Sequence, residues 1–223
     1  MQRTSAFGAS CLVNPAAGSS DRVCVGLVNL LGVRVSARAI LNQAEHERRR
    51  ALGITALTDP ALLGRLLELP VGCSVLDPVV WAEAAGQPTG VVIRGDDGHT
   101  VTRLLEPALT VEDVIVPGPP GHEMQAVQDA SLFASFTTRW VTVEAQGAPD
   151  AMVMEAKLCG VGLLGQDGQV ILAAEQPTSS AIDGWAWLLW EKTYRRWLKE
   201  HSPAHETGNQ AQATGEASAT PTS

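Results

Sequence analysis

The chain has 223 residues, a formal net charge of −8 and a hydrophobic fraction of 45%. This apolar content excludes a wholly disordered chain, and no run of about 18 apolar residues is present that could cross a bilayer. The acidic balance argues against a protein that binds nucleic acid through its bulk charge.

Residues 1–116 are predicted to form a mostly helical N-terminal part with one β-hairpin. The apolar run 23–31 fits a buried strand or a buried helix equally well, because periodicity does not separate them. Over residues 36–52 apolar side chains recur at helical spacing, Ser36 is a suitable N-cap and Gly53 follows the last turn. We therefore expect the first clear helix there.

Two further helices are expected after Asp59-Pro60 and Asp77-Pro78, because an aspartate before a proline at the first helical position is a typical helix start. The period then changes to two over residues 91–104, around Gly95-Asp96-Asp97-Gly98. This pattern predicts a β-hairpin. The order of three helices and a hairpin resembles a winged helix and implies a DNA-binding regulator as one alternative function. However, the third helix carries no basic or amide side chain for contacting bases.

A second part is predicted over residues 122–200, after the Pro/Gly-rich boundary 117–121. It is expected to contain a helix over 123–136, a three-stranded antiparallel meander over 137–145, 151–164 and 169–175, and a long helix over 180–200. Residues 202–223 are rich in Ser, Thr, Ala, Gly and Gln and are predicted to be disordered. The fold class is therefore predicted as α+β.

The long terminal helix carries four large rings on one stripe, at positions i, i+3, i+7 and i+10: Trp187, Trp190, Tyr194 and Trp197. The strands could cover one side of such a helix, but its apolar surface is wide enough to need cover on a second side. Because tryptophan is common at interaction hot spots, we expect these four residues to bind a partner protein or a second copy of the chain. The preferred function is thus a non-enzymatic protein-binding or assembly module.

The segment Glu155-Ala156-Lys157, preceded by Asp150, offers an enzymatic alternative. On a hydrophobic strand it resembles the metal-binding core of the restriction-endonuclease-like nucleases. That resemblance implies carboxylates that hold Mg²⁺ and a lysine that steadies the attacking water. The competing interpretation is preferred. It places Arg139 opposite Lys157 on the neighbouring strand, so that Arg139, Glu155 and Lys157 form a cross-strand charge cluster on the solvent face.

Two loops are similar to turns of the diacylglycerol and lipid kinase family: Asn14-Pro15-Ala16-Ala17-Gly18 and Gly95-Asp96-Asp97-Gly98-His99-Thr100. The resemblance implies backbone N–H groups that approach a phosphate. Asp96 stands where that family has a glycine, and His99 is inserted before Thr100. A leader loop and a hairpin turn explain the same residues.

The cysteines, Cys11, Cys24, Cys73 and Cys159, lack Cys-x-x-Cys spacing and have no histidine close in sequence. Zinc and dithiol chemistry are therefore not expected, and neither a metal nor a cofactor is predicted. Isolated cysteines are typical of a reducing compartment, and the stretch before Cys11 is short and polar for a secretion signal. We expect a cytoplasmic protein.

Overall fold

The computed structural model describes residues 21–76, 90–96, 100–144, 148–177 and 182–201. The larger of its two sheets has the strand order β1 (Arg22–Leu30), β2 (Val33–Leu41), β6 (Leu109–Pro117), β7 (Thr138–Val143), β8 (Gly162–Gly165) and β9 (Val170–Leu172). The smaller sheet has the order β3 (Ser74–Leu76), β5 (Thr100–Arg103) and β4 (Val92–Arg94). The helices are α1 (Gln43–Leu52), α2 (Pro60–Glu68), α4 (Glu123–Ser131), α5 (Asp150–Leu158) and α6 (Gly184–His201).

The larger sheet is mixed. β1, β2 and β6 pair antiparallel, β6, β7 and β8 pair parallel, and β9 returns antiparallel to β8. The parallel pairs require crossover connections, which α4 and α5 supply. The fold is therefore α+β in composition but differs from the predicted arrangement.

The prediction of a helical N-terminal part is wrong, because the described chain begins with the β1–β2 hairpin. Leu31 and Gly32 form its two-residue turn with φ values of 51° and 86°, the positive pair that a tight hairpin turn requires. The helix expected over 36–52 begins only after Asn42, whose side chain accepts the N–H of Glu45. Ala37, Ala39 and Leu41 are buried on one face of β2 while Ile40 is exposed, so the period there is two.

The predicted three-stranded meander is also wrong. Residues 151–164 were expected to be one strand, but α5 occupies the first part and β8 the last. The burial of Met152 and Ala156, four residues apart, marks the helical face of α5. The segment is also rich in Ala, Met, Glu and Lys, which favour helices.

Other predicted elements are present. α2 begins after Asp59, whose carboxylate accepts the N–H groups of Ala61 and Leu62. β4 pairs antiparallel with β5 as a hairpin, although it lies in a three-stranded sheet with β3. The helix expected after Asp77-Pro78, the loop around Asn14, the turn residues 97–99 and the tail 202–223 lie outside the described residues.

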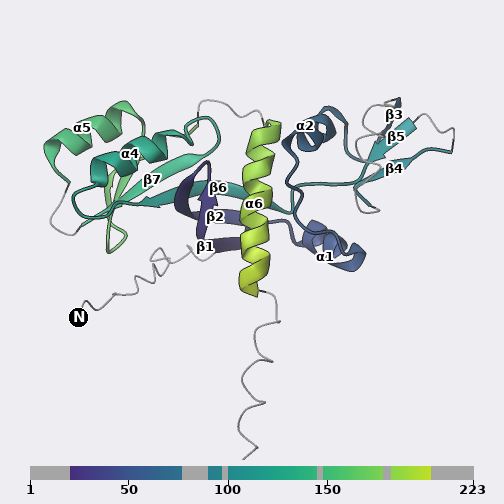
Figure 1. Cartoon of the computed structure of the whole chain (residues 1–223), viewed down its shortest axis with the longest axis horizontal. Coiled ribbons are helices and arrows are strands. Elements are labelled where there is room, and N and C mark those ends of the chain that lie inside the picture. The colour runs from purple at the N-terminus through teal and green to yellow at the C-terminus, as the bar shows by residue number, and fades with distance from the viewer. Residues whose placement is uncertain (1–20, 77–89, 97–99, 145–147, 178–181, 202–223) are drawn as a thin grey trace, which may run out of the picture.

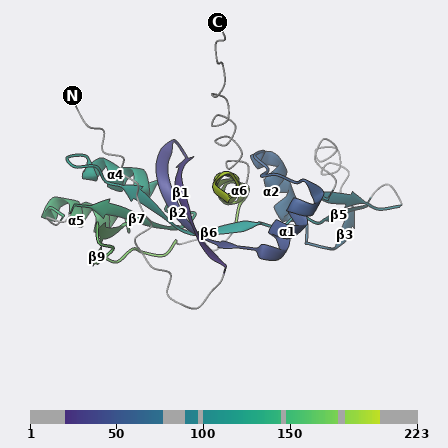
Figure 2. The same ribbon diagram turned by 90° about the horizontal axis from the view of Figure 1, so that it is seen from below.

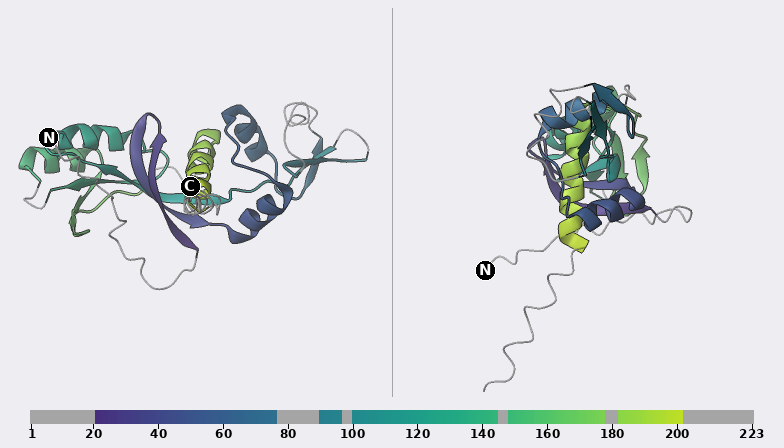
Figure 3. Two further views of the ribbon diagram at one scale, coloured as in Figure 1. Left: turned by 60° about the horizontal axis from the view of Figure 1, so that its bottom comes forward. Right: turned by 90° about the vertical axis from the view of Figure 1, so that its right-hand side faces the viewer.

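Helix α6 stands between the β1–β2 hairpin on one side and α2 on the other (Figures 1 and 2). It contacts α2, β1 and β6, so this helix packs against three elements that precede residue 118 in the chain. The left-hand view of Figure 3 shows the β1–β2 hairpin beside α6, while α4 and α5 lie farther along the sheet. This arrangement leaves one long side of α6 facing β1.

Candidate functional site

The four rings expected to form a contact surface lie inside the subunit. Trp187, Trp190, Tyr194 and Trp197 are exposed by only 0%, 7%, 1% and 8%. The hydroxyl oxygen of Tyr194 is 2.9 Å from Nδ1 of His46 on α1, and the rings of Tyr194 and Trp197 stack with centroids 6.1 Å apart. The rings therefore attach α6 to its own subunit. The rings therefore no longer support a partner-binding surface, because α1 and α2 cover the side of α6 that was expected to need a partner.

A buried charge network joins α1 to α6 beside these rings. The guanidinium of Arg49 is fully buried and donates to both carboxylate oxygens of Glu191, over 2.9 and 2.8 Å. Its Nε donates to Glu45 over 2.9 Å. Glu191 also accepts the backbone N–H of Leu57 at 2.9 Å and Nε1 of Trp187 at 3.0 Å. Every group in this cluster has its partners, so it fixes one arrangement of the two helices.

The charges of this network reinforce one another. Burial alone would raise the pKa of Glu45, but the hydrogen bonds and charges of Arg48 and Arg49 outweigh it and hold that pKa below its ordinary value. Burial would lower the pKa of Arg49, yet Glu191 and Glu45 raise it overall. Glu45 and Arg49 therefore stay charged at neutral pH. The charged groups of the network are paired with one another, so the network holds α1 and α6 together.

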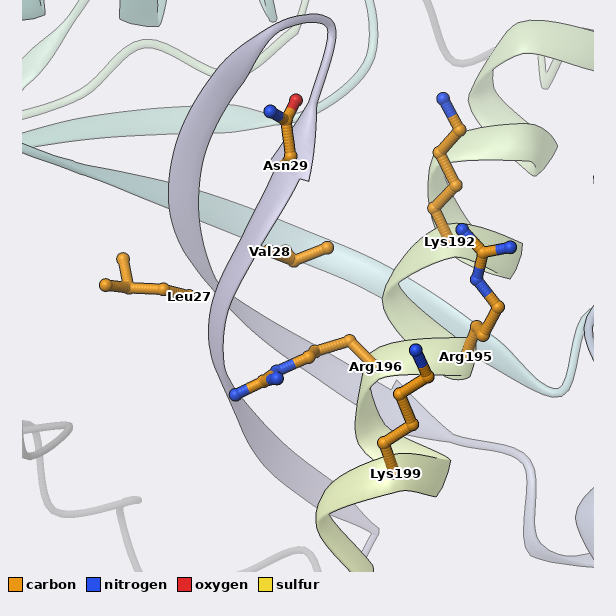
Figure 4. A pocket seen from close by; sticks show the side chains of 7 residues that line it. All are labelled: Leu27, Val28, Asn29, Lys192, Arg195, Arg196 and Lys199. Carbon is orange, nitrogen blue, oxygen red and sulfur yellow. The ribbon is translucent and has the colours of Figure 1, made fainter.

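The opposite side of α6 is basic. Lys192, Arg195, Arg196 and Lys199 stand at positions i, i+3, i+4 and i+7, so they form one stripe, on the side of α6 away from the buried rings. This stripe faces β1 across an open groove of about 210 Å³ (Figure 4). We call it the basic groove; it is lined by Leu27, Val28, Asn29, Lys192, Arg195, Arg196 and Lys199.

The positive charge of the basic groove is only partly compensated. Arg195, Arg196 and Lys199 are exposed, and Lys192 is half-buried. Arg196 pairs with Glu200 over 2.8 Å. Within the described ranges, no carboxylate forms an ion pair with Lys192, Arg195 or Lys199. This row of cations distinguishes the surface from the rest of a chain whose net charge is −8.

The residues of the nuclease interpretation are not brought together. Asp150, Glu155 and Lys157 all lie on α5, with Asp150 and Lys157 exposed and Glu155 half-buried. Positions two apart share a face on a strand but point in nearly opposite directions on a helix. The Glu-x-Lys arrangement on which that interpretation depends is therefore not formed. In the part of the chain that the structure describes, no group of three His, Cys, Asp or Glu side chains could hold a metal ion.

The expected cross-strand cluster of Arg139, Glu155 and Lys157 is not formed either, since α5 replaces the strand. Arg139 is instead buried on β7, where its Nη2 donates to the carbonyl oxygen of Cys159 over 2.7 Å. The Cys159 thiol lies 3.9 Å from Glu155 Oε1, and burial together with this carboxylate raises the pKa of Cys159. This shift favours the protonated thiol, which is the less nucleophilic form.

Comparisons with protein-family models, with curated proteins and with solved structures find no match to this chain. Among the described residues, no helix has the length and apolar character needed to cross a membrane. Any assignment of function therefore depends on the structure of the chain itself.

The four basic residues of the last helix are not among the contact residues expected from the sequence. Their spacing over 192, 195, 196 and 199 was a readable signal for a cationic stripe. The other wall of the groove was not readable. Residues 27–29 lie more than 160 positions earlier, and only the folded chain brings β1 beside α6.

Proposed function

We propose that this protein is a binding module that holds a short acidic segment of a partner protein in the basic groove. The observation that carries the proposal is the row of four cationic side chains on α6, of which three lack a paired carboxylate among the described residues. Helix α6 keeps the role expected from the sequence, but its cationic face replaces the buried rings as the contact surface.

The dimensions of the groove suit a short extended segment. From Lys192 to Lys199 the helix rises about 10 Å, which about three residues of extended chain would span. Val28, whose side chain points from β1 toward α6, adds apolar surface next to the charges (Figure 4). Carboxylates of an acidic segment would meet the cations, while the rest of the segment would lie against β1. Such contacts give specificity and a fast encounter.

A protein segment is favoured over a nucleic acid on two grounds. The chain as a whole carries −8, so a long polyanion is repelled by the rest of the molecule. The seven residues that line the groove include no aromatic side chain on which a base could stack. A short acidic segment needs only the local charge.

The test is fluorescence anisotropy with a labelled ten-residue polyglutamate peptide at low salt, with polyglutamine as the control peptide. We expect saturable binding of polyglutamate that weakens as salt is added, since exposed charges are screened. Replacing Arg195 and Lys199 by Gln removes two cations and should weaken binding by about fivefold to tenfold, at up to about 1 kcal/mol for each exposed ion pair.

The matched control is the double variant Arg50→Gln and Lys157→Gln, which removes two exposed cations from the last turns of α1 and α5. It should bind polyglutamate as the unmodified protein does. An equal loss in both double variants, or no saturable binding, would overturn the proposal. Tighter binding of labelled single-stranded DNA that depends on Arg195 and Lys199 would also overturn it, in favour of a nucleic acid.

A further inference from the structure

A carboxylate of the chain itself, that of Glu200, lies next to the basic groove and contacts Arg196, one of its lining residues. Glu200 Oε1 accepts a hydrogen bond from Arg196 Nε over 2.8 Å, and Glu200 Oε2 accepts one from the backbone N–H of Gly26 over 3.3 Å. The two donors come from α6 and from β1, the two walls of the groove. The Glu200 carboxylate therefore connects α6 with β1.

The backbone of β1 is shaped for this contact. β1 is an edge strand, and its pairing with β2 shifts register between Val25 and Val28, so Gly26 lies in the irregular stretch. A bulge leaves a residue outside the regular ladder. Here the Gly26 N–H is directed to a side chain on α6.

The absence of a side chain at Gly26 leaves room for this contact. A Cβ atom at this position would lie 2.7 Å from Glu200 Oε1, closer than real Cβ contacts. A larger residue would make the flexible Glu200 side chain shift, so glycine lets the carboxylate approach the N–H group and the guanidinium together without that shift.

We propose that the Gly26 N–H and the Arg196 guanidinium form a carboxylate-binding position, and that Glu200 occupies it until an Asp or Glu side chain of the partner segment displaces it. This inference rests on the proposed function. Glu200 then acts as an internal competitor that sets how strongly the groove binds. The ion pair between Glu200 and Arg196 is exposed, and exposed ion pairs contribute little free energy. Replacing Glu200 by a carboxylate of the partner segment therefore costs little free energy.

The test is the affinity of Glu200→Ala for the same polyglutamate peptide. Removing the competitor should tighten binding by about threefold to tenfold, the range expected when one exposed charge interaction is exchanged for another. Glu112→Ala is the matched control, because Glu112 is also half-exposed and also pairs with an arginine, Arg22, at 3.1 Å. It should leave the affinity unchanged.

A second measurement separates displacement at this position from a general change of charge. In the Glu200→Ala background, Arg196→Gln should cancel the gain, whereas in the unmodified protein the same substitution should have a much smaller effect. In NMR spectra of the unmodified protein, the Gly26 amide signal should shift on addition of the peptide.

Each outcome has one meaning. Equal tightening in Glu200→Ala and Glu112→Ala, or an unmoved Gly26 amide at saturation, would overturn this inference. If Glu200→Ala binds no tighter while the Arg195 and Lys199 double variant still loses affinity, the inference fails and the proposed function stands. If neither the unmodified protein nor Glu200→Ala binds polyglutamate, both fail.

Discussion

Tyr194 shows how one buried side chain couples the folded state to pH. It lies at the contact of α6 with α1, 1% exposed, with its hydroxyl against His46 and its ring 5.4 Å from the Arg49 guanidinium carbon. Burial raises the pKa of Tyr194 to about 12, with Arg49 opposing that shift and Glu191 and Glu45 adding to it. The folded protein therefore favours the neutral phenol.

This shift predicts the alkaline limit of stability. An unfolded tyrosine ionises near pH 10. Because the folded pKa is higher, the stabilisation is complete below pH 10 and is lost as the pH rises toward about 12. The free energy of unfolding should thus fall more steeply with pH in the unmodified protein than in Tyr194→Phe, measured by urea titration from pH 8 upward.

Tyr194 is the only tyrosine of the chain, so the absorbance of its phenolate gives its pKa directly. Ionisation at the value of an unfolded tyrosine, while the protein remains folded, would contradict this account of the α1–α6 contact.

At the scale of elements, α1 and α6 are joined more by charge than by an ordinary apolar seam. α1 has few apolar residues and buries Glu45 and Arg49, while α6 buries Glu191. Moving such charges out of water costs free energy, and this cost is offset only when each charge keeps its hydrogen-bond and ion-pair partners. The network therefore penalises any other placement of α6, including one that would disrupt the basic groove on its far side.

Removal of one partner should accordingly be severe. Glu191→Ala leaves Arg49 buried without its bidentate partner and should lower the free energy of unfolding by about 3–5 kcal/mol. Glu47→Ala is the control, because Glu47 is exposed on α1, the helix that carries Arg49, and its side chain is bonded only to Gln43 among the described residues. Its loss should change the free energy of unfolding by less than about 0.5 kcal/mol. Urea denaturation followed by circular dichroism measures both, and equal small effects would show that the network contributes little.

At the scale of the whole molecule, one core runs through both predicted parts of the chain. The connected cluster of buried apolar residues includes Leu63 and Val101 from the first part and Val141 and Trp187 from the second. β6 and β7 also pair across the predicted boundary 117–121. The division into parts 1–116 and 122–200 stays a prediction, and its test is the cooperativity of unfolding.

We expect a single transition. Since the core is shared, urea unfolding followed by tryptophan fluorescence and by far-ultraviolet circular dichroism should give coincident curves. The tryptophans report mainly on α6, whereas circular dichroism reports on every element. Two separated transitions would instead support independent domains.

The sequence by itself determined the elements with strong local signals. Asp59-Pro60 marked the start of α2, the two-residue period marked the β4–β5 hairpin, and the long apolar stripe marked α6. In each case neighbours along the chain supply the deciding interaction: a cap, a turn or a repeated buried position. The α+β composition followed from them.

Only the tertiary structure decided the rest. Residues 36–41 and 151–158 carry apolar side chains that fit either period, and the sheet and its crossovers selected strand for the first and helix for the second. The burial of the tryptophan stripe and the contact of Glu200 with Gly26 depend on residues more than a hundred positions apart. Such contacts form when the whole chain buries its apolar surface, so no local pattern contains them.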